Sequence, residues 1–302
     1  MVPGKRQGGM TDSAFEQLVA ELRPKLHRYC ARMSGSVIDG EDVLQEALVK
    51  AVKARPNAGE IAQPERWLFR IAHNAALDFL RRRARAEARQ SNEDPEMIVD
   101  PDEERPDPEL VSTSLRTFMR LPPVQRSSVI LMDVLGYPIS EIGAIMDASL
   151  PAVKSALHRG RSRLHELANE PQDVAPPALS PTEGALLNAY VDRFNAHDYD
   201  AVRAMLAEEV RLDLVNRLQL NGRTEVQRYF TNYANATPRR FALGFVDAHP
   251  AMLVYEATAP EVVSYFVLID FTGRNVARIR DFLYAPYALE GATITTVTAS
   301  TA

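Results

Sequence analysis

The chain has 302 residues, 46% of them hydrophobic and 25% charged, with a formal net charge of −5. This composition is typical of globular proteins and leaves room for two domains or three small ones. No apolar run approaches the roughly 18 residues of a membrane span, and the first residues lack the apolar core of a signal peptide. We therefore expect a cytoplasmic protein without membrane contact. The single cysteine, Cys30, excludes an internal disulfide framework and a cysteine-rich zinc site.

Charge is distributed unevenly along the chain. Residues 1–90 hold 16 Lys and Arg against 11 acidic residues, whereas residues 91–110 hold one against nine. Residues 111–170 are basic again, with seven against five, and residues 171–302 are acidic, with 11 against 15. This pattern predicts two basic modules joined by an acidic connector and followed by a mildly acidic third module.

Two proline-rich stretches mark the module boundaries. The connector, SNEDPEMIVDPDEERPDPEL, has four prolines and nine acids, which oppose both helix and core formation. We interpret it as a flexible linker, and NEPQDVAPPALSP as a second one. The first module starts near Met10, which is an alternative to Met1 as the true start. The predicted segments are 10–90, the linker 91–110, 111–168, the linker 169–181, 182–290 and a disordered tail 291–302.

The first module has the apolar periodicity of helices. In DVLQEALVKAVK, residues 42–53, apolar and polar side chains fall on opposite faces of a helix. The apolar face holds Leu44, Ala47, Leu48 and Ala51, and the polar face holds Asp42, Gln45, Glu46 and Lys53. Residues 65–85 form a second helix, whose apolar stripe runs from Leu68 to Phe79. Arg70, Asn74 and Arg81 lie opposite that stripe.

The second module contains a basic helix without acids, SLPAVKSALHRGRSRL, residues 149–164. Ser149 is a good N-cap, and apolar residues from Val153 to Leu164 share one face. The helix SEIGAIMD precedes it, separated by a three-residue turn that lacks glycine. Helix, tight turn and second helix predict a helix-turn-helix, which places the second helix in the DNA major groove. We predict Lys154, Ser155 and His158 as base contacts, and Pro151, Arg159, Arg161 and Arg163 as further DNA contacts, the arginines on phosphates.

The third module combines helices with a later series of strands. GALLNAYVDRFNAHD and YDAVRAMLAEEV have helical patterns, and TEVQRYFTNYAN is a third helix. Five strand-like runs rich in Val, Tyr, Phe and Leu accompany this third helix, one before it and four after it. They are RLDLV, FALGFV, AMLVYEA, VVSYFVLIDF and NVARIRDFLY. Helices first and a strand meander afterwards predict an α+β domain.

The first two modules resemble a known family. DVLQEALVKAVKA with PERWLFRIAHNAALDFLRRRAR resembles region 2 of the extracytoplasmic-function (ECF) sigma factors, and LPPVQRSSVILMDVLGYPISEIGAIMDASLPAVKSALHRGRSRL resembles their region 4. The resemblance covers residues 12–168 and implies a promoter-specificity subunit of bacterial RNA polymerase. It assigns polymerase binding to Asp42, Gln45 and Glu46. It assigns recognition of an extruded base of the minus-ten element to Asn74. It assigns recognition of the minus-thirty-five element to Lys154, Ser155 and His158. Trp67 is a candidate for stacking on unpaired bases, and the strand backbone would be held by Arg70, Arg81, Arg82, Arg83 and Arg85.

The third module looks like the SnoaL-like cone fold. LLNAYVDRFNAHDYDAVRAMLAEEVRLDL carries this resemblance, which implies a curved sheet around an apolar pocket. A subgroup of ECF sigma factors carries such a domain as a built-in regulator, although its glycine-rich signature is not matched by NGRTE at 221–225. Asp213 and Asp281 lie in strand runs and are candidate pocket residues, where a desolvated carboxyl would serve as a general base.

The sequence therefore predicts a multidomain sigma factor: two all-α domains and an α+β cone-shaped domain that regulates them. We expect core RNA polymerase and promoter DNA as partners, an intramolecular contact of the third module with the first two, no catalytic activity and no cofactor or metal. A small-molecule ligand in the cone stays open. Two alternatives remain: a one-component helix-turn-helix regulator with a ligand-sensing domain, and a small-molecule isomerase or cyclase fused to a DNA-binding region.

Overall fold

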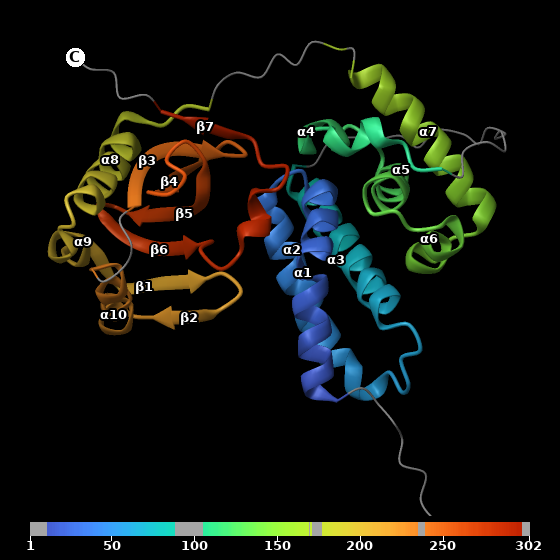
Figure 1. Cartoon of the computed structure of the whole chain (residues 1–302), viewed down its shortest axis with the longest axis horizontal. Coiled ribbons are helices and arrows are strands. Elements are labelled where there is room, and N and C mark those ends of the chain that lie inside the picture. Colours follow the sequence, from blue (N-terminus) through green and yellow to red (C-terminus); the bar gives the residue numbers. More distant parts are fainter. Residues whose placement is uncertain (1–10, 88–104, 169, 171–176, 235–238, 298–302) are drawn as a thin grey trace, which may run out of the picture. The chain divides into compact units, whose positions relative to one another are not determined.

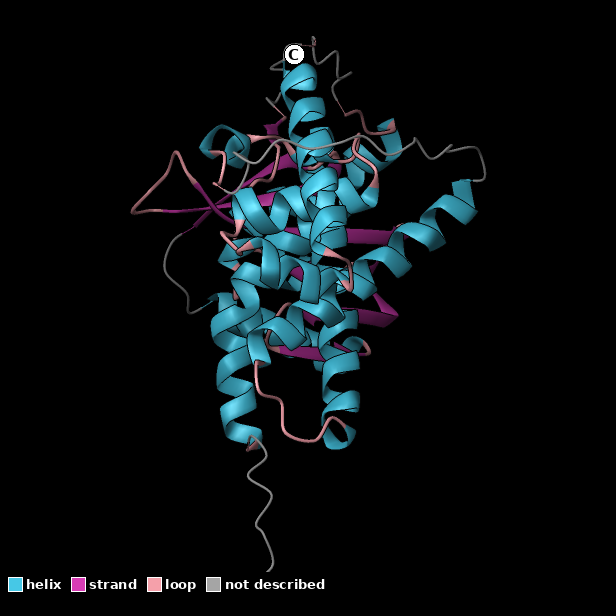
Figure 2. Ribbon diagram, turned by 90° about the vertical axis from the view of Figure 1, so that its right-hand side faces the viewer, coloured by secondary structure: helices cyan, strands magenta, loops and turns pink. Residues whose placement is uncertain are grey.

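A computed structural model describes residues 11–87, 105–168, 170, 177–234 and 239–297. The chain divides into two compact units, Met1–Gln172 and Asp173–Ala302. The described part of the first unit is helical, and every described strand belongs to the second (Figure 1). Helices and strands are distinguished by colour in Figure 2. The predicted combination of helical regions with an α+β domain is therefore confirmed. Most of the predicted acidic linker and the last residues of the predicted tail lie outside the described residues.

The first unit begins with three long helices and ends with the predicted basic helix. Its elements are α1 (Asp12–Ser34), α2 (Val37–Ala54), η1 (Arg55–Asn57), α3 (Pro64–Glu87), η2 (Pro108–Ser112), α4 (Leu115–Phe118), α5 (Pro123–Val129), η3 (Ile130–Val134), α6 (Ile139–Met146) and α7 (Leu150–Ala168). Both sequence regions contribute to one apolar core. Tyr29 and Phe69 from the first region and Phe118, Ile142 and Leu157 from the second are all buried in it. The two predicted helical modules therefore form one packed unit.

The helix-turn-helix is built without glycine in its turn. Helix α6 ends at Met146, and Asp147 adopts a left-handed conformation with φ of 56°. Aspartate tolerates this conformation better than most residues, so it replaces the absent glycine. A glycine is needed instead within α7, because a Cβ added to Gly160 would lie 2.7 Å from Cγ2 of Val129 in α5. The absence of a side chain at Gly160 therefore lets the basic helix α7 pack closely against α5.

The second unit has three α-helices, one 3₁₀ helix and seven strands among its described residues. They are α8 (Pro181–Asn195), α9 (Tyr199–Ala204), β1 (Leu206–Leu214), β2 (Leu218–Asn221), α10 (Arg223–Ala234), β3 (Arg239–Val246), β4 (His249–Glu256), β5 (Val263–Thr272), β6 (Asn275–Asp281), η4 (Pro286–Leu289) and β7 (Ile294–Thr296).

Two expectations about the elements of the second unit were wrong. The helix expected to reach Val210 stops at Ala204, because the following residues pair with β6. Residues 294–296 of the expected disordered tail pair with β3.

The seven strands form one sheet in the order β2-β1-β6-β5-β4-β3-β7. Strands β1 and β6 are parallel, and the other neighbours are antiparallel. The core of this unit joins one face of the sheet to α8, α9 and α10, with Phe194, Phe230 and Tyr265 fully buried (Figure 1). In the part of the chain that is described, no helix has the length and apolar character to cross a membrane.

Candidate nucleic-acid interface

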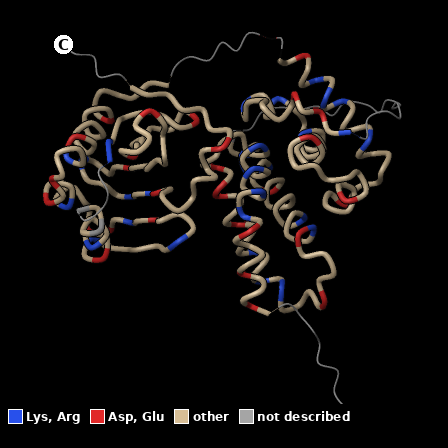
Figure 3. The backbone as a smooth tube through the Cα atoms, in the orientation of Figure 1, with Lys and Arg blue, Asp and Glu red and all other residues tan. Residues whose placement is uncertain are grey.

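Helix α7 presents a basic face opposite its buried face. Val153, Leu157 and Leu164 are buried, as the periodicity predicted. Pro151 is exposed, and Lys154, Ser155 and His158 are half-buried. The guanidinium of Arg159 donates to Oγ of Ser155 over 2.8 Å. Lys and Arg recur along this helix in Figure 3. The residues predicted to read bases thus lie on the side of α7 that faces away from the core.

Arg161 has different surroundings from the other basic residues of α7. Its guanidinium donates to both carboxylate oxygens of Asp133 in η3, over 2.5 and 3.1 Å, and to the carbonyl oxygen of Arg105 over 2.6 Å. Side-chain exposure is only 11% for Arg161 and 0% for Asp133. Burial raises the pKa of Asp133, and Arg161 opposes that rise. This geometry favours an anchoring role for Arg161 over the predicted phosphate contact.

The end of the predicted acidic linker is held against the same helix. Nε2 of His165 lies 2.9 Å from Oδ2 of Asp107, and the backbone amide of Asp107 donates to Oδ1 of Asp133. Arg163 forms an exposed ion pair of 2.8 Å with Glu166. Residues from Arg105 onward therefore belong structurally to the second helical region, although the sequence assigned them to the linker.

Helix α3 carries the predicted minus-ten residues on one exposed face. Arg70, Asn74, Arg81 and Arg85 are exposed and recur at intervals of four, seven and four residues. At 100° per residue these positions fall within about 60° of one another. Arg81 forms an ion pair of 3.3 Å with Asp78, one turn earlier. The face around Asn74 is thus basic and open, as the sequence predicted.

Arg82 and Arg83 turn away from that face toward α2. Arg82 forms an ion pair of 2.6 Å with Glu46, and Arg83 one of 3.6 Å with Asp39. Glu46 also lies 2.9 Å from Lys50. Hydrogen bonds from Arg82 and Lys50 hold the pKa of Glu46 below its usual range. The structure therefore separates the five arginines into an outward set and a set engaged by α2.

Trp67 is partly buried and packs against the apolar core of the first unit. The apolar stripe that follows it in α3, with Leu68, Ala72 and Ala75, is fully buried in the same core. This packing against the core is enough to explain why a tryptophan occupies position 67, without any nucleic-acid partner. Stacking of Trp67 on unpaired bases stays a prediction.

The outward face of α2 combines polar and apolar side chains. Asp42 is exposed, and Nε2 of Gln45 donates to Glu41 over 3.0 Å. Val49 and Val52 are 51% and 59% exposed. Their spacing from Asp42 places them on one stripe with it and Gln45. These valines were not among the predicted polymerase contacts, because only the inward residues of α2 were expected to be apolar. Their position on the polar face of the helix was the available signal.

A buried polar cluster joins the two helical regions. The hydroxyl of Tyr29 in α1 lies 2.8 Å from Nδ1 of His73 in α3 and 2.8 Å from Oγ of Ser127 in α5. All three side chains are almost completely buried. Burial, with a smaller contribution from Arg81, lowers the pKa of His73 to about 4. The cluster therefore holds a neutral imidazole between the regions.

Further polar contacts join the same two regions. Arg126 in α5 donates to the backbone carbonyl oxygen of Met33 in α1 over 2.5 Å. Glu65 in α3 accepts from Lys25 and from the hydroxyl of Tyr137. Arg70 lies 3.4 Å from Asp147 in the helix-turn-helix turn. An arginine of the candidate minus-ten face is thus paired with the module that carries α7.

In the second unit, Asp281 lies in the core. Its Oδ2 accepts from the hydroxyls of Tyr229 and Tyr233, the latter over 2.8 Å, and its Oδ1 accepts from the amide of Leu283. Burial raises the pKa of Asp281, and the two tyrosine hydrogen bonds oppose this. Both carboxylate oxygens are therefore occupied by the protein's own donors.

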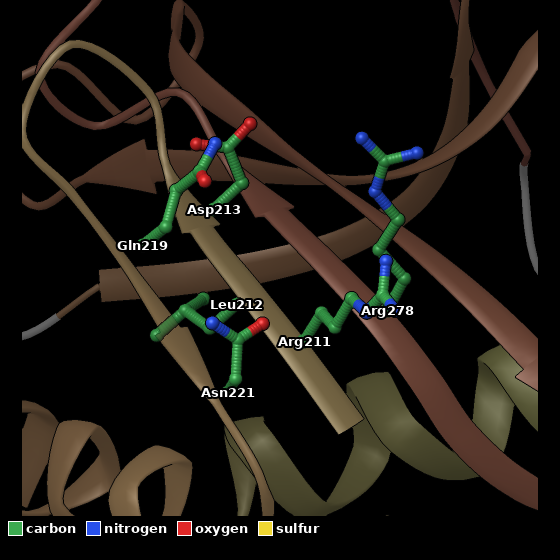
Figure 4. A pocket seen from close by; sticks show the side chains of 6 residues that line it. All are labelled: Arg211, Leu212, Asp213, Gln219, Asn221 and Arg278. Atoms are coloured by element: carbon green, nitrogen blue, oxygen red, sulfur yellow. The ribbon is translucent and has the colours of Figure 1, made fainter. Parts of the chain in front are cut away.

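Asp213 lies on the opposite face of the sheet from Asp281. It pairs in register with Gln219 and Arg280, and its Oδ2 lies 3.5 Å from Nε of Arg280. Asp213 lines an open cavity of about 260 Å³ (Figure 4). The two candidate pocket residues therefore do not share a site, and the described residues contain no cluster of His, Cys, Asp and Glu suited to a metal ion.

Comparisons with known proteins match the helical unit. The Sigma-70 region 2 model matches residues 18–86, and the Sigma-70, region 4 model matches residues 115–164. The chain is 33% identical over 176 residues to the ECF RNA polymerase sigma factor SigE of Mycolicibacterium smegmatis, covering 55% of this chain and 66% of SigE. It is 33% identical over 157 residues to the RNA polymerase sigma factor CarQ of Myxococcus xanthus, covering 52% of this chain and 90% of CarQ.

A solved structure is similar over a longer stretch. The extracytoplasmic function sigma factor SigJ of Mycobacterium tuberculosis is 20% identical, with a TM-score of 0.35, covering 91% of this chain and 98% of SigJ.

Proposed function

Since the chain belongs to the ECF family of RNA polymerase sigma factors, we propose that it directs bacterial core RNA polymerase to specific promoters and starts transcription there. One observation supports this proposal most directly. A single packed unit carries an exposed basic face on α3 and a half-buried basic face on α7, together with a separate mixed stripe on α2. A regulator that only binds DNA has no use for the third surface. The proposed site of action is the cytoplasm, where bacterial transcription takes place.

The two basic faces have different proposed roles. On α7, Lys154, Ser155 and His158 read the edges of bases in the minus-thirty-five element, because early residues of a recognition helix reach the major groove. Pro151, Arg159 and Arg163 position that helix on the duplex. On α3, the side-chain amide of Asn74 donates hydrogen bonds to an extruded base and accepts hydrogen bonds from it. Arg70, Arg81 and Arg85 bind the backbone of the melted strand.

The stripe on α2 is the proposed polymerase contact. Asp42 and Gln45 supply polar groups, and Val49 and Val52 supply apolar area that is exposed in the free chain. Such exposed valines gain free energy when a partner helix covers them. Glu46 contributes less directly in this proposal, since Arg82 and Lys50 already engage it.

The closed packing of the helical unit has a consequence for promoter binding. The two elements are centred about 25 base pairs apart, which is roughly 85 Å at 3.4 Å per base pair. Helix α3 and the turn that precedes α7 are joined by the 3.4 Å contact of Arg70 with Asp147. We propose that the unit opens at the Tyr29–His73–Ser127 cluster when polymerase and promoter bind. The second unit, tethered after Glu170, is the proposed regulator of this opening.

A fused isomerase or cyclase is the second candidate, and the buried Asp281 with its tyrosines is the observation that favours it. A general base needs a free lone pair toward the substrate. Because Asp281 is completely buried and accepts hydrogen bonds from Tyr229, Tyr233 and the amide of Leu283, a structural role of this carboxyl is the better proposal.

In vitro transcription tests the proposal. Core polymerase from the host bacterium is supplied with genomic DNA fragments, with and without the full chain, and the 5′ ends of transcripts are mapped. The proposal predicts new start sites preceded by a shared pair of elements. Absence of new start sites, together with failure to co-purify with core polymerase, would favour the one-component regulator instead.

A further inference from the structure

Two arginines stand side by side on the sheet face of the second unit that points away from its helices. Arg211 in β1 and Arg278 in β6 are direct partners in the parallel register. Neighbouring strands lie about 4.8 Å apart, so the two side chains leave the sheet close together. Figure 4 shows the two arginines next to each other, with the side chain of Asn221 beside Arg211 and that of Gln219 beside Asp213. Like charges placed directly opposite each other in a sheet are destabilising.

Neither arginine of this pair has an ion-pair partner in the described part of the unit. The side chains of Arg211 and Arg278 form no hydrogen bond or ion pair with the described residues, whereas Arg203, Arg223 and Arg228 each have an acidic partner. Asp270 lies opposite Arg278 in register, but no ion pair within 4.0 Å joins them. The carboxylate of Asp213, the acid that lines the cavity, is next to Arg280. Both guanidinium groups are therefore without an ion-pair partner among the described residues.

The same two arginines line the open cavity of about 260 Å³, with the amides of Gln219 and Asn221 among its other lining groups. Asn221 is the register partner of Arg211 on its other side, so an amide and two guanidinium groups follow one another across three strands. Guanidinium and amide groups all donate hydrogen bonds, and arginine is the side chain best suited to bind phosphate or carboxylate through two parallel bonds.

We propose that this cavity binds a small phosphate monoester. A monoester carries close to two negative charges at neutral pH, which match the two positive charges of Arg211 and Arg278, whereas a simple carboxylate carries one. The phosphodiester backbone of DNA is a poorer match. Duplex binding needs an extended positive surface, and residues 171–302 hold 11 basic residues against 15 acidic ones. A local pair of arginines in a hollow captures a small anion despite the acidic surroundings.

Titration calorimetry of the full chain with glycerol 3-phosphate tests this proposal, with glycerol as the uncharged comparison and ionic strength held constant. We expect the wild type to bind glycerol 3-phosphate and not glycerol. Arg211→Gln and Arg278→Gln should each weaken binding about tenfold or more, since each removes charged hydrogen-bond donors. Arg274→Gln is the matched control, because Arg274 is exposed in the β5–β6 turn, outside the cavity lining. It should bind as the wild type does.

Thermal unfolding without ligand checks that the two cavity variants fold, and their midpoints should not fall, because each substitution relieves like-charge repulsion. Absence of binding to the wild type, or an equal loss in Arg274→Gln, would overturn the proposal. A further arm measures binding of a short duplex. If Arg211→Gln weakens duplex binding while glycerol 3-phosphate does not bind, the pair contacts DNA backbone and the monoester site is contradicted.

Discussion

Lys154 and Arg161 lie on the same helix, yet their surroundings differ. Lys154 is half-buried on the face predicted to read bases, whereas the guanidinium of Arg161 is enclosed by Asp133 and the carbonyl oxygen of Arg105. The sequence predicted DNA contacts for both residues, Lys154 on bases and Arg161 on phosphates. The difference between them comes from Asp133, which lies 28 residues before Arg161 and contacts it only in the folded unit.

Arg161→Ala should destabilise the helical unit by about 3 kcal/mol or more at neutral pH, because it leaves a buried carboxylate without its cation. Urea unfolding measures this loss. Arg163→Ala is the control, since Arg163 is exposed and an exposed ion pair contributes less than about 1 kcal/mol. Equal effects of the two substitutions would contradict the anchoring role of Arg161.

Lys154→Ala should reduce discrimination between the cognate upstream element and a one-base variant by about 1–3 kcal/mol, the range for a good base contact. Fluorescence anisotropy with both duplexes measures it. Arg163→Ala should weaken binding to both duplexes alike and lower the slope of affinity against salt. Unchanged discrimination in Lys154→Ala would remove this lysine from the base-reading set.

His73 predicts a pH dependence of stability. Its pKa in the folded chain is about 4, below the ordinary value of 6.5, so the folded state binds fewer protons between these two values. Stability should therefore fall as pH falls from 6.5 to 4, by up to about 3 kcal/mol from this group. Urea unfolding across this range compares the wild type with His73→Gln, which should show a shallower fall. Identical slopes would exclude His73 as the source.

At the scale of elements, helix α2 carries a surface that periodicity alone did not reveal. Val49 and Val52 are exposed next to Asp42 and Gln45. Val49→Asp should weaken binding to core polymerase at least about tenfold without unfolding the chain, because an exposed valine contributes little to folding. Pull-down with core polymerase measures this. Val262→Asp is the control, since Val262 is 64% exposed in the second unit. Equal retention of both variants would contradict the proposed contact.

The main helices and most strands were predictable because their apolar periodicities are strong. The buried faces of α2, α3 and α7 follow directly from spacing. The boundaries of the helices and strands were harder to predict. Residues after Ala204 have a helical sequence pattern, yet they form β1 because β6 pairs with them. The same holds for Arg82 and Arg83, whose orientation depends on Glu46 and Asp39 in another helix. Long-range partners, not local pattern, decided these cases.

At the scale of the whole molecule, the second unit is joined to the first by a short proline-rich stretch after Glu170. A short tether keeps two units at an effective concentration in the millimolar range, so even a weak contact is populated. Truncation after Glu170 should therefore change transcription in vitro. Release of an inhibitory contact raises output, and loss of a supporting contact lowers it. Output equal to that of the full chain would contradict a regulatory role.

Fluorescence energy transfer between the two helical regions tests most directly whether the closed helical unit opens on promoter binding. The closed unit must open to reach both promoter elements. Cysteines placed at Gln63 and Ser140, both exposed and each within three residues of the hydrogen bond between Tyr137 and Glu65, accept dyes, while the native Cys30 is buried. We expect high transfer efficiency in the free chain and a large fall in the transcribing complex with core polymerase and promoter DNA. Unchanged efficiency while transcripts are made would contradict the proposed opening.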